Sequence, residues 1–248
     1  MNDVEVKFGC ARLPEAELAA LASYAAKATW PTGFALYERG TPADGLFVVL
    51  RGRVVLRNRV KAGRGYVPMM VAEGEIFGLE GLAPDNVYMT DARADEETET
   101  YHLSSARFRA FLREQPQHAI ALMGQVASEH AMLLGKLREL ATQSVEQRLV
   151  AALARMARHG AFTASDGRIT LSAAQYRLLC ELIGATRESV TLVVNRLISQ
   201  GLAERHGGDF VLAPPHTLFQ RVEGDGLDGE LRIPLTIEGN GHSRQATA

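Results

Sequence analysis

Four polar side chains between residues 187 and 195 have the types and the spacing needed to read the edges of DNA bases. Arg187, Glu188, Thr191 and Asn195 recur at spacings of three and four residues, which places them on one face of a helix. Their side chains donate and accept hydrogen bonds at base edges and phosphates. We therefore predict that double-stranded DNA is contacted by Thr186, Arg187, Glu188, Ser189, Thr191, Leu192, Asn195 and Arg196.

Two apolar stripes around Gly184 predict the helices that position this face. Both keep the spacing of a packed helix face, with Leu179, Leu182 and Ile183 before the glycine and Val190, Val193, Val194 and Leu197 after it. Glycine tolerates the positive φ of a tight turn, and Thr186 can cap the second helix. We expect residues 176–198 to form a helix-turn-helix. An ordinary helical hairpin with a solvated face is the alternative.

A β-hairpin is expected directly after the second helix. Gln200 and Gly201 end that helix, and the runs LAER and FVLA at residues 202–205 and 210–213 read as short strands. The glycines of the loop at residues 206–209 suit a hairpin turn. A helix-turn-helix followed by such a hairpin is a winged helix.

The charge distribution favours DNA contact in the same segment. Residues 144–221 hold 9 basic and 6 acidic side chains, whereas residues 1–143 hold 16 and 18 and residues 222–248 hold 2 and 5. Only the segment with the helix-turn-helix is net positive. The excess is modest for a polyanion partner, so the placement of individual arginines and dimerisation must supply most of the electrostatic attraction.

The overall composition of the 248-residue chain is that of an ordinary globular protein, long enough for two domains. No apolar run approaches the roughly 20 residues that span a bilayer, and the start MNDVEVKFG is not a signal peptide, so we expect a cytoplasmic protein without membrane contact. Cys10 and Cys180 have no disulfide or metal-ligand spacing. No nucleophile motif, phosphate loop or carboxylate pair indicates an enzyme.

The fold class expected from the pattern of elements is α+β. A short helix is predicted from Leu13 to about Lys27, and glycine-punctuated β-rich runs follow from Trp30 to Leu103, which indicates an antiparallel β-barrel or jelly roll. The predicted domains are a sensor barrel at residues 1–115, a dimerisation helix at 116–143, the DNA-binding domain at 144–221 and a flexible extension at 222–248.

A heptad-like seam lies within the helical pattern that runs from Phe108 to Leu140. Its members alternate at spacings of three and four and are Met123, Val126, His130, Leu133, Leu137 and Leu140. A seam of this length usually pairs with a second copy, so we predict a homodimer. His130 within it is either hydrogen-bonded at the dimer interface or a pH or ligand switch. A further amphipathic helix is predicted from Val145 to His159.

The order of these elements resembles the Crp/Fnr family of bacterial transcription regulators from roughly Trp30 to Ala213. The motifs that carry the resemblance are Gly33, Tyr37-Glu38-Arg39-Gly40, Leu50-Arg51-Gly52-Arg53-Val54, Gly74-Glu75-Ile76-Phe77-Gly78, Phe108 with Pro116, and Gly184-Ala185-Thr186-Arg187-Glu188-Ser189-Val190. The resemblance implies a cyclic-nucleotide-binding-like sensor domain, a dimer helix, and winged helices on a palindromic operator beside RNA polymerase.

Arg187 and Glu188 would be the base readers by this resemblance, and both roles are physically sound. The family often has a second arginine where this chain has Leu192. An apolar side chain there suits a thymine methyl group, so the preferred half-site should differ from the best-known one.

The predicted effector pocket departs from the members of the family that bind cyclic AMP. They are similar in a Gly-Glu pair for the ribose, an Arg-Ser pair for the phosphate and Thr-Ser for the adenine. The corresponding positions here are Gly78, Leu79, Glu80, Tyr88, Met89, Leu133 and Leu134. A buried phosphate without its arginine is costly, so we predict that cyclic AMP is not the effector unless Arg93 supplies the charge.

No cofactor is predicted. Two cysteines cannot hold the four-cysteine iron-sulfur cluster of the family's oxygen sensors. Haem could be held by His102, His118 or His130, but isolated histidines are more often structural. The alternative to a DNA-binding regulator is a module that senses a small molecule, haem or another nucleotide and acts mainly through protein contacts.

Overall fold

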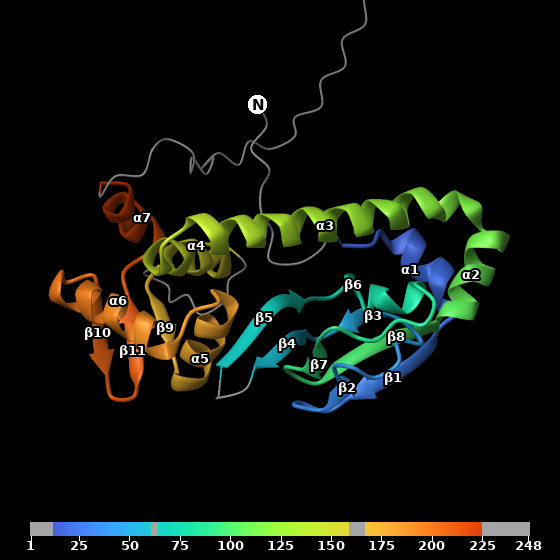
Figure 1. Ribbon diagram of the computed structural model, residues 1–248, viewed down its shortest axis with the longest axis horizontal. Helices are drawn as coiled ribbons and strands as arrows, with labels where there is room; N and C mark the ends of the chain where they lie inside the picture. Colours follow the sequence, from blue (N-terminus) through green and yellow to red (C-terminus); the bar gives the residue numbers. More distant parts are fainter. Residues whose placement is uncertain (1–11, 61–63, 159–166, 225–248) are drawn as a thin grey trace, which may run out of the picture.

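Residues 12–60, 64–158 and 167–224 are described by the computed structural model. A two-sheet domain and a small helical domain lie at opposite ends of the molecule, and one long helix, α3 (Ala119–Thr142), runs along the first towards the second (Figure 1).

The N-terminal domain is a sandwich of two antiparallel four-stranded sheets. One has the strand order β1 (Ala26–Trp30), β8 (Thr98–Ser104), β3 (Gly45–Arg51) and β6 (Ile76–Phe77). The other has the order β2 (Ala35–Tyr37), β7 (Asp91–Ala94), β4 (Val54–Val60) and β5 (Arg64–Val71). Across residues 12–60 and 64–158 neither sheet closes on itself, so the architecture is an open jelly roll rather than a closed barrel.

Alternating apolar side chains explain why the sheets pack face to face. Phe47 and Val49 of β3 meet Leu56 of β4 and Met69 of β5 in one buried cluster. The opposite face of β3 packs through Leu46 and other side chains against α1 (Glu15–Ala22) and α2 (Ser105–Glu114). The sandwich is therefore covered by helices on one side.

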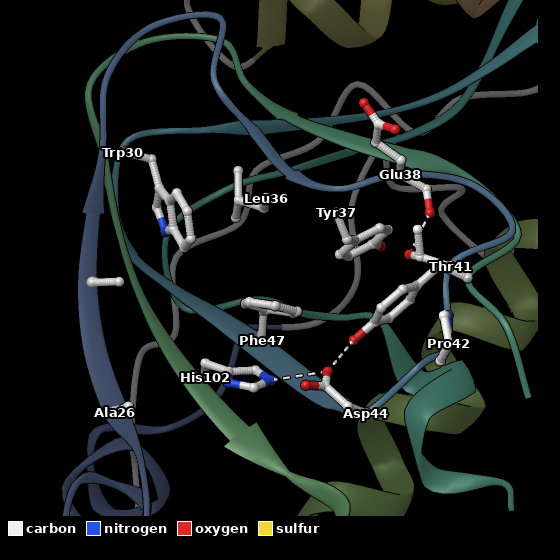
Figure 2. Close-up of a pocket in the computed structure, with 12 residues that line it drawn as sticks. Ala26, Trp30, Leu36, Tyr37, Glu38, Thr41, Pro42, Asp44, Phe47 and His102 are labelled. Atoms are coloured by element: carbon white, nitrogen blue, oxygen red, sulfur yellow. Dashed lines mark hydrogen bonds and ion pairs between the residues drawn. The ribbon is translucent and has the colours of Figure 1, made fainter. Parts of the chain in front are cut away.

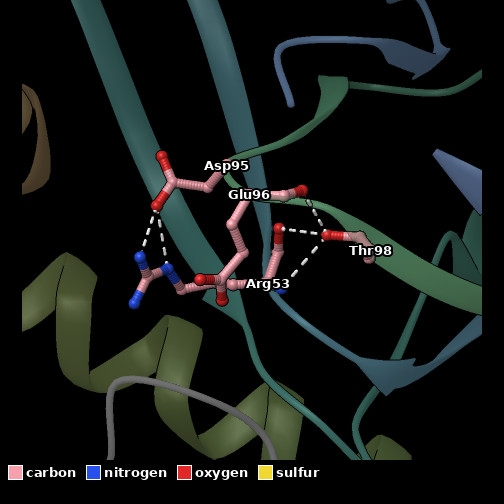
Figure 3. Close-up of polar contacts among 4 residues, drawn as sticks. All are labelled: Arg53, Asp95, Glu96 and Thr98. Atoms are coloured by element: carbon pink, nitrogen blue, oxygen red, sulfur yellow. Dashed lines mark hydrogen bonds and ion pairs between the residues drawn. The ribbon is translucent and has the colours of Figure 1, made fainter. Parts of the chain in front are cut away.

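Polar contacts join the two sheets at one end of the sandwich (Figure 3). Gly52 has a φ of +86° and turns the chain from β3 into β4. The next residue, Arg53, donates from Nε and Nη2 to Oδ2 of Asp95 at 2.9 and 2.6 Å. The Thr98 hydroxyl accepts from the Arg53 amide at 3.2 Å and lies 2.8 Å from the carbonyl oxygen of Glu96. These contacts hold the turn between β3 and β4 against the turn between β7 and β8.

Two predicted element boundaries in this domain are wrong. The first helix ends at Ala22 rather than near Lys27, because residues 26–30 pair with β8 as strand β1. The single helix predicted from Phe108 is interrupted: α2 ends at Glu114, and the 3-10 turn η2 (Pro116–His118) precedes α3. Proline lacks the amide hydrogen that would continue α2.

Helix α3 presents two different faces. The face turned to the sandwich buries Leu122, Gln125, Met132, Lys136 and Glu139. Met132 reaches the core between the sheets, and Lys136 and Glu139 form an ion pair at 3.7 Å. The other face carries exposed apolar side chains.

The C-terminal domain packs its helices around one apolar core. Its elements are α4 (Val145–Arg158), β9 (Ile169–Leu171), α5 (Ala173–Leu182), α6 (Arg187–Ser199), β10 (Ala203–His206), β11 (Asp209–Leu212) and α7 (Pro215–Gly224). Helix α4 ends one residue before the predicted His159, which lies outside the described residues. Helix α7 continues past the predicted domain boundary at residue 221; residues 225–248 of the predicted extension lie outside the described part.

The two domains contact each other directly. Strand β5 lies against α5 (Figure 1), and Val55, Val67 and Leu182 form a buried cluster with Met70 and Leu178 packed around it. The sandwich therefore supports the helix-turn-helix through an apolar interface.

Candidate functional site

Helices α5 and α6 form the helix-turn-helix that the sequence predicts. Gly184 has a φ of +62°, and the Ala185 amide donates to the Cys180 carbonyl at 3.0 Å to close the turn. Thr186 caps α6 by accepting from the Ser189 amide at 3.2 Å. Ser172 and Gln175 form a reciprocal capping box that starts α5. Local sequence thus fixes both ends of the turn.

The inner faces of both helices are buried as predicted. The apolar stripes that flank Gly184 are buried within this domain and at its contact with the sandwich. Arg148 of α4 donates to the Ile183 carbonyl at 2.8 Å, which satisfies the end of α5. Burial raises the pKa of the Cys180 thiol to about 11, in keeping with a packing role; Cys10 lies outside the described residues. The buried inner face therefore fixes the position of α6 and of its outer face.

The predicted DNA contacts divide into an exposed set and a supporting set. Of the predicted contacts on α6, the exposed ones are Arg187, Glu188, Leu192, Asn195 and Arg196. Leu192 is 70% exposed, which is unusual for a large apolar side chain on a helix with a well-formed core. A leucine in this position is available to an outside partner.

The supporting set is partly buried and bonded within the domain. The Thr186 and Ser189 hydroxyls lie 3.0 Å apart at the start of α6. The Thr191 hydroxyl donates to the Arg187 carbonyl at 2.7 Å and lies 3.1 Å from the Tyr176 hydroxyl. These three residues therefore position the helix through contacts within the domain.

Arg196 belongs to the exposed set but has a partner. Its Nη1 lies 2.9 Å from Oε2 of Glu146 at the start of α4. This ion pair ties the end of α6 to the helix that leads back to α3.

A hairpin of β10 and β11 follows α6, at the residues where the sequence predicts one. The turn between His206 and Asp209 lies at its exposed tip, and β11 pairs with β9 on its other edge. Arg205 lies over the Phe210 ring, 4.9 Å from its centroid. Arg205 was not among the predicted contacts; its exposed position beside the tip now makes it a candidate for a phosphate contact.

The seam predicted for dimerisation faces solvent along α3. Met123 is 71% exposed and Leu137 62%, and Val126, Leu133 and His130 are also exposed. Ile120 and Leu134 widen the same apolar face. Leu140 differs, because it is half-buried beside Gly184 of its own chain.

The structure does not bring the residues predicted to line an effector pocket together into one pocket. Leu133 and Leu134 are exposed on the outer side of α3. Tyr88 is buried, stacks on Tyr37 with 3.8 Å between ring centroids, and shares a core cluster with Met132. Gly78 and Leu79 begin the 3-10 turn η1 (Leu79–Leu82). Side chains from the sandwich and α3 thus pack together where the resemblance places a nucleotide.

The groups beside this aromatic stack are acidic. Glu80 Oε1 accepts from the Met89 amide at 3.2 Å. Burial, and secondarily the negative charge of Glu80, raise the pKa of Glu129 on α3 to about 7. Arg93 faces elsewhere, since it donates to the Gly33 carbonyl at 3.2 Å and lies 3.9 Å from Glu38. Besides the predicted Glu80, the described structure therefore places a second carboxyl group, that of Glu129, near the aromatic stack.

The three histidines considered for haem have separate surroundings. His102 stacks on Phe47 and lies 3.4 Å from Asp44, and His118 lies 3.4 Å from Glu17. His130 is exposed on α3. Over the described ranges, no group of three or more His, Cys, Asp or Glu side chains could hold a metal ion, and no helix has the length and apolar character to cross a membrane.

Two family models match the two domains in the order found here. The cyclic nucleotide-binding domain matches residues 28–115, and the Crp-like helix-turn-helix domain matches residues 147–236. The chain belongs to the Crp/Fnr family of transcription regulators. The exposed α6 is thus the second helix of a Crp-like helix-turn-helix.

Curated relatives of this Crp/Fnr chain cover most of its length. A CRP-like cAMP-activated global transcriptional regulator of Mycobacterium tuberculosis is 21% identical over 206 residues, 83% of this chain and 92% of that protein. The cAMP-activated global transcriptional regulator CRP of Escherichia coli is 24% identical over 186 residues, 74% of this chain and 87% of that one.

Solved structures share the fold. The c-di-GMP responsive global regulator CLP of Xanthomonas campestris aligns with a TM-score of 0.70 and 22% identity, over 81% of this chain and 99% of that one. A CRP/FNR family regulator of Thermus thermophilus aligns with a TM-score of 0.66 and 22% identity, over 81% and 100%.

Proposed function

We propose that this Crp/Fnr chain is a cytoplasmic transcription regulator that binds a palindromic operator as a homodimer and reads each half-site with α6. The observation that carries the proposal is the outer face of α6. Its side chains Arg187, Glu188, Leu192 and Asn195 are exposed, whereas the inner face of the helix is buried in the core of the domain. Because an isologous dimer has two-fold symmetry, its two α6 helices read half-sites about one DNA turn apart, roughly 34 Å. RNA polymerase is the expected protein partner.

The dimer part of this proposal is supported by the apolar face of α3. Large apolar side chains that stay exposed along one helix face mark an interaction surface. Their spacing of three and four residues matches that of a paired helix, and the face is continuous from Ile120 to Leu137. A second copy of the same helix is the partner with the complementary surface.

We further propose that cyclic AMP does not control this regulator. Tyr88 stands where the family's cyclic-AMP-binding members have an arginine, and its neutral ring stacks on Tyr37. Glu80 and Glu129 lie beside this position, and each repels a phosphate when it is ionised. The names of the relatives show that members of this fold answer to different nucleotides, cAMP in one and c-di-GMP in another.

Selection of operators from random DNA with the purified protein tests the proposal that α6 contacts the bases of each half-site. The wild type is expected to select a palindrome, and Arg187→Ala and Glu188→Ala are each expected to lose preference at one base pair per half-site, worth about 1–3 kcal/mol of discrimination. An unchanged consensus with both variants would contradict the assignment.

Calorimetry with cyclic AMP tests the second proposal. We expect no specific heat, whereas a tight isotherm with one ligand per protomer would overturn it. The rival reading, a sensing module that acts through protein contacts, predicts that selection from random DNA yields no consensus.

A further inference from the structure

A hollow lies in the sandwich beside the stacked rings of Tyr37 and Tyr88. Its volume is about 430 Å³, within the range of sites that hold small molecules. Strands β1 and β2, the loop before β3, and residues of β3 and β8 form its walls, and no residue of α3 lines it. The hollow therefore shares Tyr88 with the predicted effector position, but its lining includes none of the other residues predicted there.

Aromatic side chains surround this hollow (Figure 2). Trp30, Tyr37 and Phe47 face it from β1, β2 and β3. Tyr88 also lines it. Phe47 stacks on His102 with 4.5 Å between ring centroids, and the Trp30 indole nitrogen donates to the Thr100 hydroxyl at 2.9 Å. The rings are thus held in fixed orientations, and their electron-rich faces attract positive charge.

One carboxylate stands at the mouth of the hollow. Asp44 Oδ1 lies 3.1 Å from the Tyr88 hydroxyl and 3.4 Å from Nε2 of His102. A dashed line in Figure 2 marks the contact between Asp44 and His102. The Asp44 side chain is 70% exposed, so it keeps acceptor positions for a ligand. Among the described residues that line the hollow, Glu38 is the only other carboxylate, and none is a lysine or an arginine.

This combination of groups selects a ligand by charge. An anion entering the hollow would lose its water and meet carboxylates and aromatic faces, which is unfavourable. A cation would exchange its water for the ring faces and for a charge-assisted hydrogen bond to Asp44. The apolar area of the walls would cover the uncharged part of the same molecule.

We propose that this hollow is a binding site for a small organic cation, an ammonium group on an aromatic or apolar body. The ammonium group lies against Asp44, and the body lies among Trp30, Tyr37 and Phe47. The site is an addition to the proposed function and does not depend on it.

The fluorescence of Trp30 gives a direct measurement, because it is the only tryptophan of the chain. We choose 2-phenylethylammonium as the probe, with uncharged 2-phenylethanol and anionic phenylacetate as matched compounds of similar size. The cation is expected to change the emission of Trp30 saturably. The alcohol should bind about tenfold more weakly, because it lacks the charge-assisted contact that the cation makes. The anion is expected not to bind.

Two substitutions locate the binding. Asp44→Asn keeps an oxygen acceptor and removes the charge. It should therefore weaken binding of the cation about tenfold and leave binding of the alcohol unchanged. Ala28→Phe fills the hollow and should abolish binding. As the control, Asp209→Asn removes a charge from the distant β-hairpin and should leave the affinity for both compounds unchanged. A thermal melt of each variant checks that it is folded.

Three results would overturn the proposal. They are phenylacetate binding as tightly as the cation, a non-saturating response to the cation, and equal weakening by Asp44→Asn and Asp209→Asn. No DNA enters the measurement, so a failure here would leave the operator-reading proposal intact.

Discussion

Arg57 on β4 and Glu181 on α5 form an ion pair across the boundary between the two domains, with 2.9 Å between Nε and Oε2. Both side chains are less than one third exposed, and the apolar cluster of Val55, Val67 and Leu182 lies beside them. Gly65 of β5 is also close to the Glu181 side chain, so a Cβ at that position would require the Glu181 carboxyl group to shift. The first helix of the helix-turn-helix is thus held by the same strands that form the sandwich.

A double-mutant cycle should detect this coupling. Arg57→Gln, Glu181→Gln and the double variant are expected to give a coupling energy of about 0.5–1 kcal/mol in urea unfolding, as for a partly screened pair. The pair of Lys27 and Glu99, 2.7 Å apart within one sheet and with the lysine 56% exposed, is the control and should couple more weakly. A coupling energy between Arg57 and Glu181 no larger than that of the control pair would show that this ion pair does not stabilise the fold.

The outer face of α3 should be required for the dimer but not for the fold. Met123→Glu and Leu137→Glu each place a charge in the proposed interface, and both side chains are exposed in the protomer. Sedimentation equilibrium should show dimer dissociation constants raised at least about 30-fold, the loss of about 2 kcal/mol typical of an interface anchor. Arg138→Glu, an exposed position off the seam, is the control. A wild type that sediments as a monomer would refute the interface.

Glu129 should make stability depend on pH in the neutral range. Its pKa is raised from 4.5 to about 7, so the folded protein holds this proton where the unfolded chain has lost it. The free energy of unfolding should therefore fall as the pH rises from about 4.5 to about 7, by about 1–3 kcal/mol in total.

Glu129→Gln isolates this effect. The variant should match the wild type near pH 5 and exceed its melting temperature near pH 8, because the amide has no proton to lose. Glu97→Gln, at an exposed turn, should leave the pH profile unchanged. Parallel melting profiles of Glu129→Gln and the wild type would show that burial of this carboxyl has no such effect.

The helix-turn-helix could be predicted from the sequence because its signals are local. The stripe on each side of Gly184 and the capping hydroxyl of Thr186 lie within 20 residues of one another, and the structure confirms each of them. The bounds of strands β6 and β7, within the β-rich region predicted from Trp30 to Leu103, could not be predicted. Both strands are short, and the residues that pair with them come from the distant strands β3 and β4.

Burial on α3 shows a second limit of sequence interpretation. The apolar seam is exposed in the protomer, whereas Gln125, Lys136 and Glu139 are buried against the sandwich. A hydrophobic pattern cannot distinguish a face that meets a second copy from one that meets its own domain. The hollow beside Trp30 was also beyond prediction, because its walls come from four strands and their loops.

Leu192 should control one position of the operator. Its exposed side chain suits a thymine methyl group, and arginine at the same place would donate to guanine. Operator selection with Leu192→Arg should therefore change one base pair per half-site from thymine to guanine. Gln200→Arg adds the same charge just beyond the end of α6 and should leave the consensus unchanged. An identical consensus for Leu192→Arg would place Leu192 outside the interface.

The central claim, that α6 engages DNA as half of a symmetric dimer, is tested most directly by the salt dependence of operator binding. Fluorescence anisotropy with the selected palindrome should show two protomers per duplex and a logarithm of the association constant that falls linearly with the logarithm of salt concentration, as counterion release requires. A duplex with one scrambled half-site should bind much more weakly. Binding that is insensitive to salt, or equally tight to the scrambled duplex, would contradict the account.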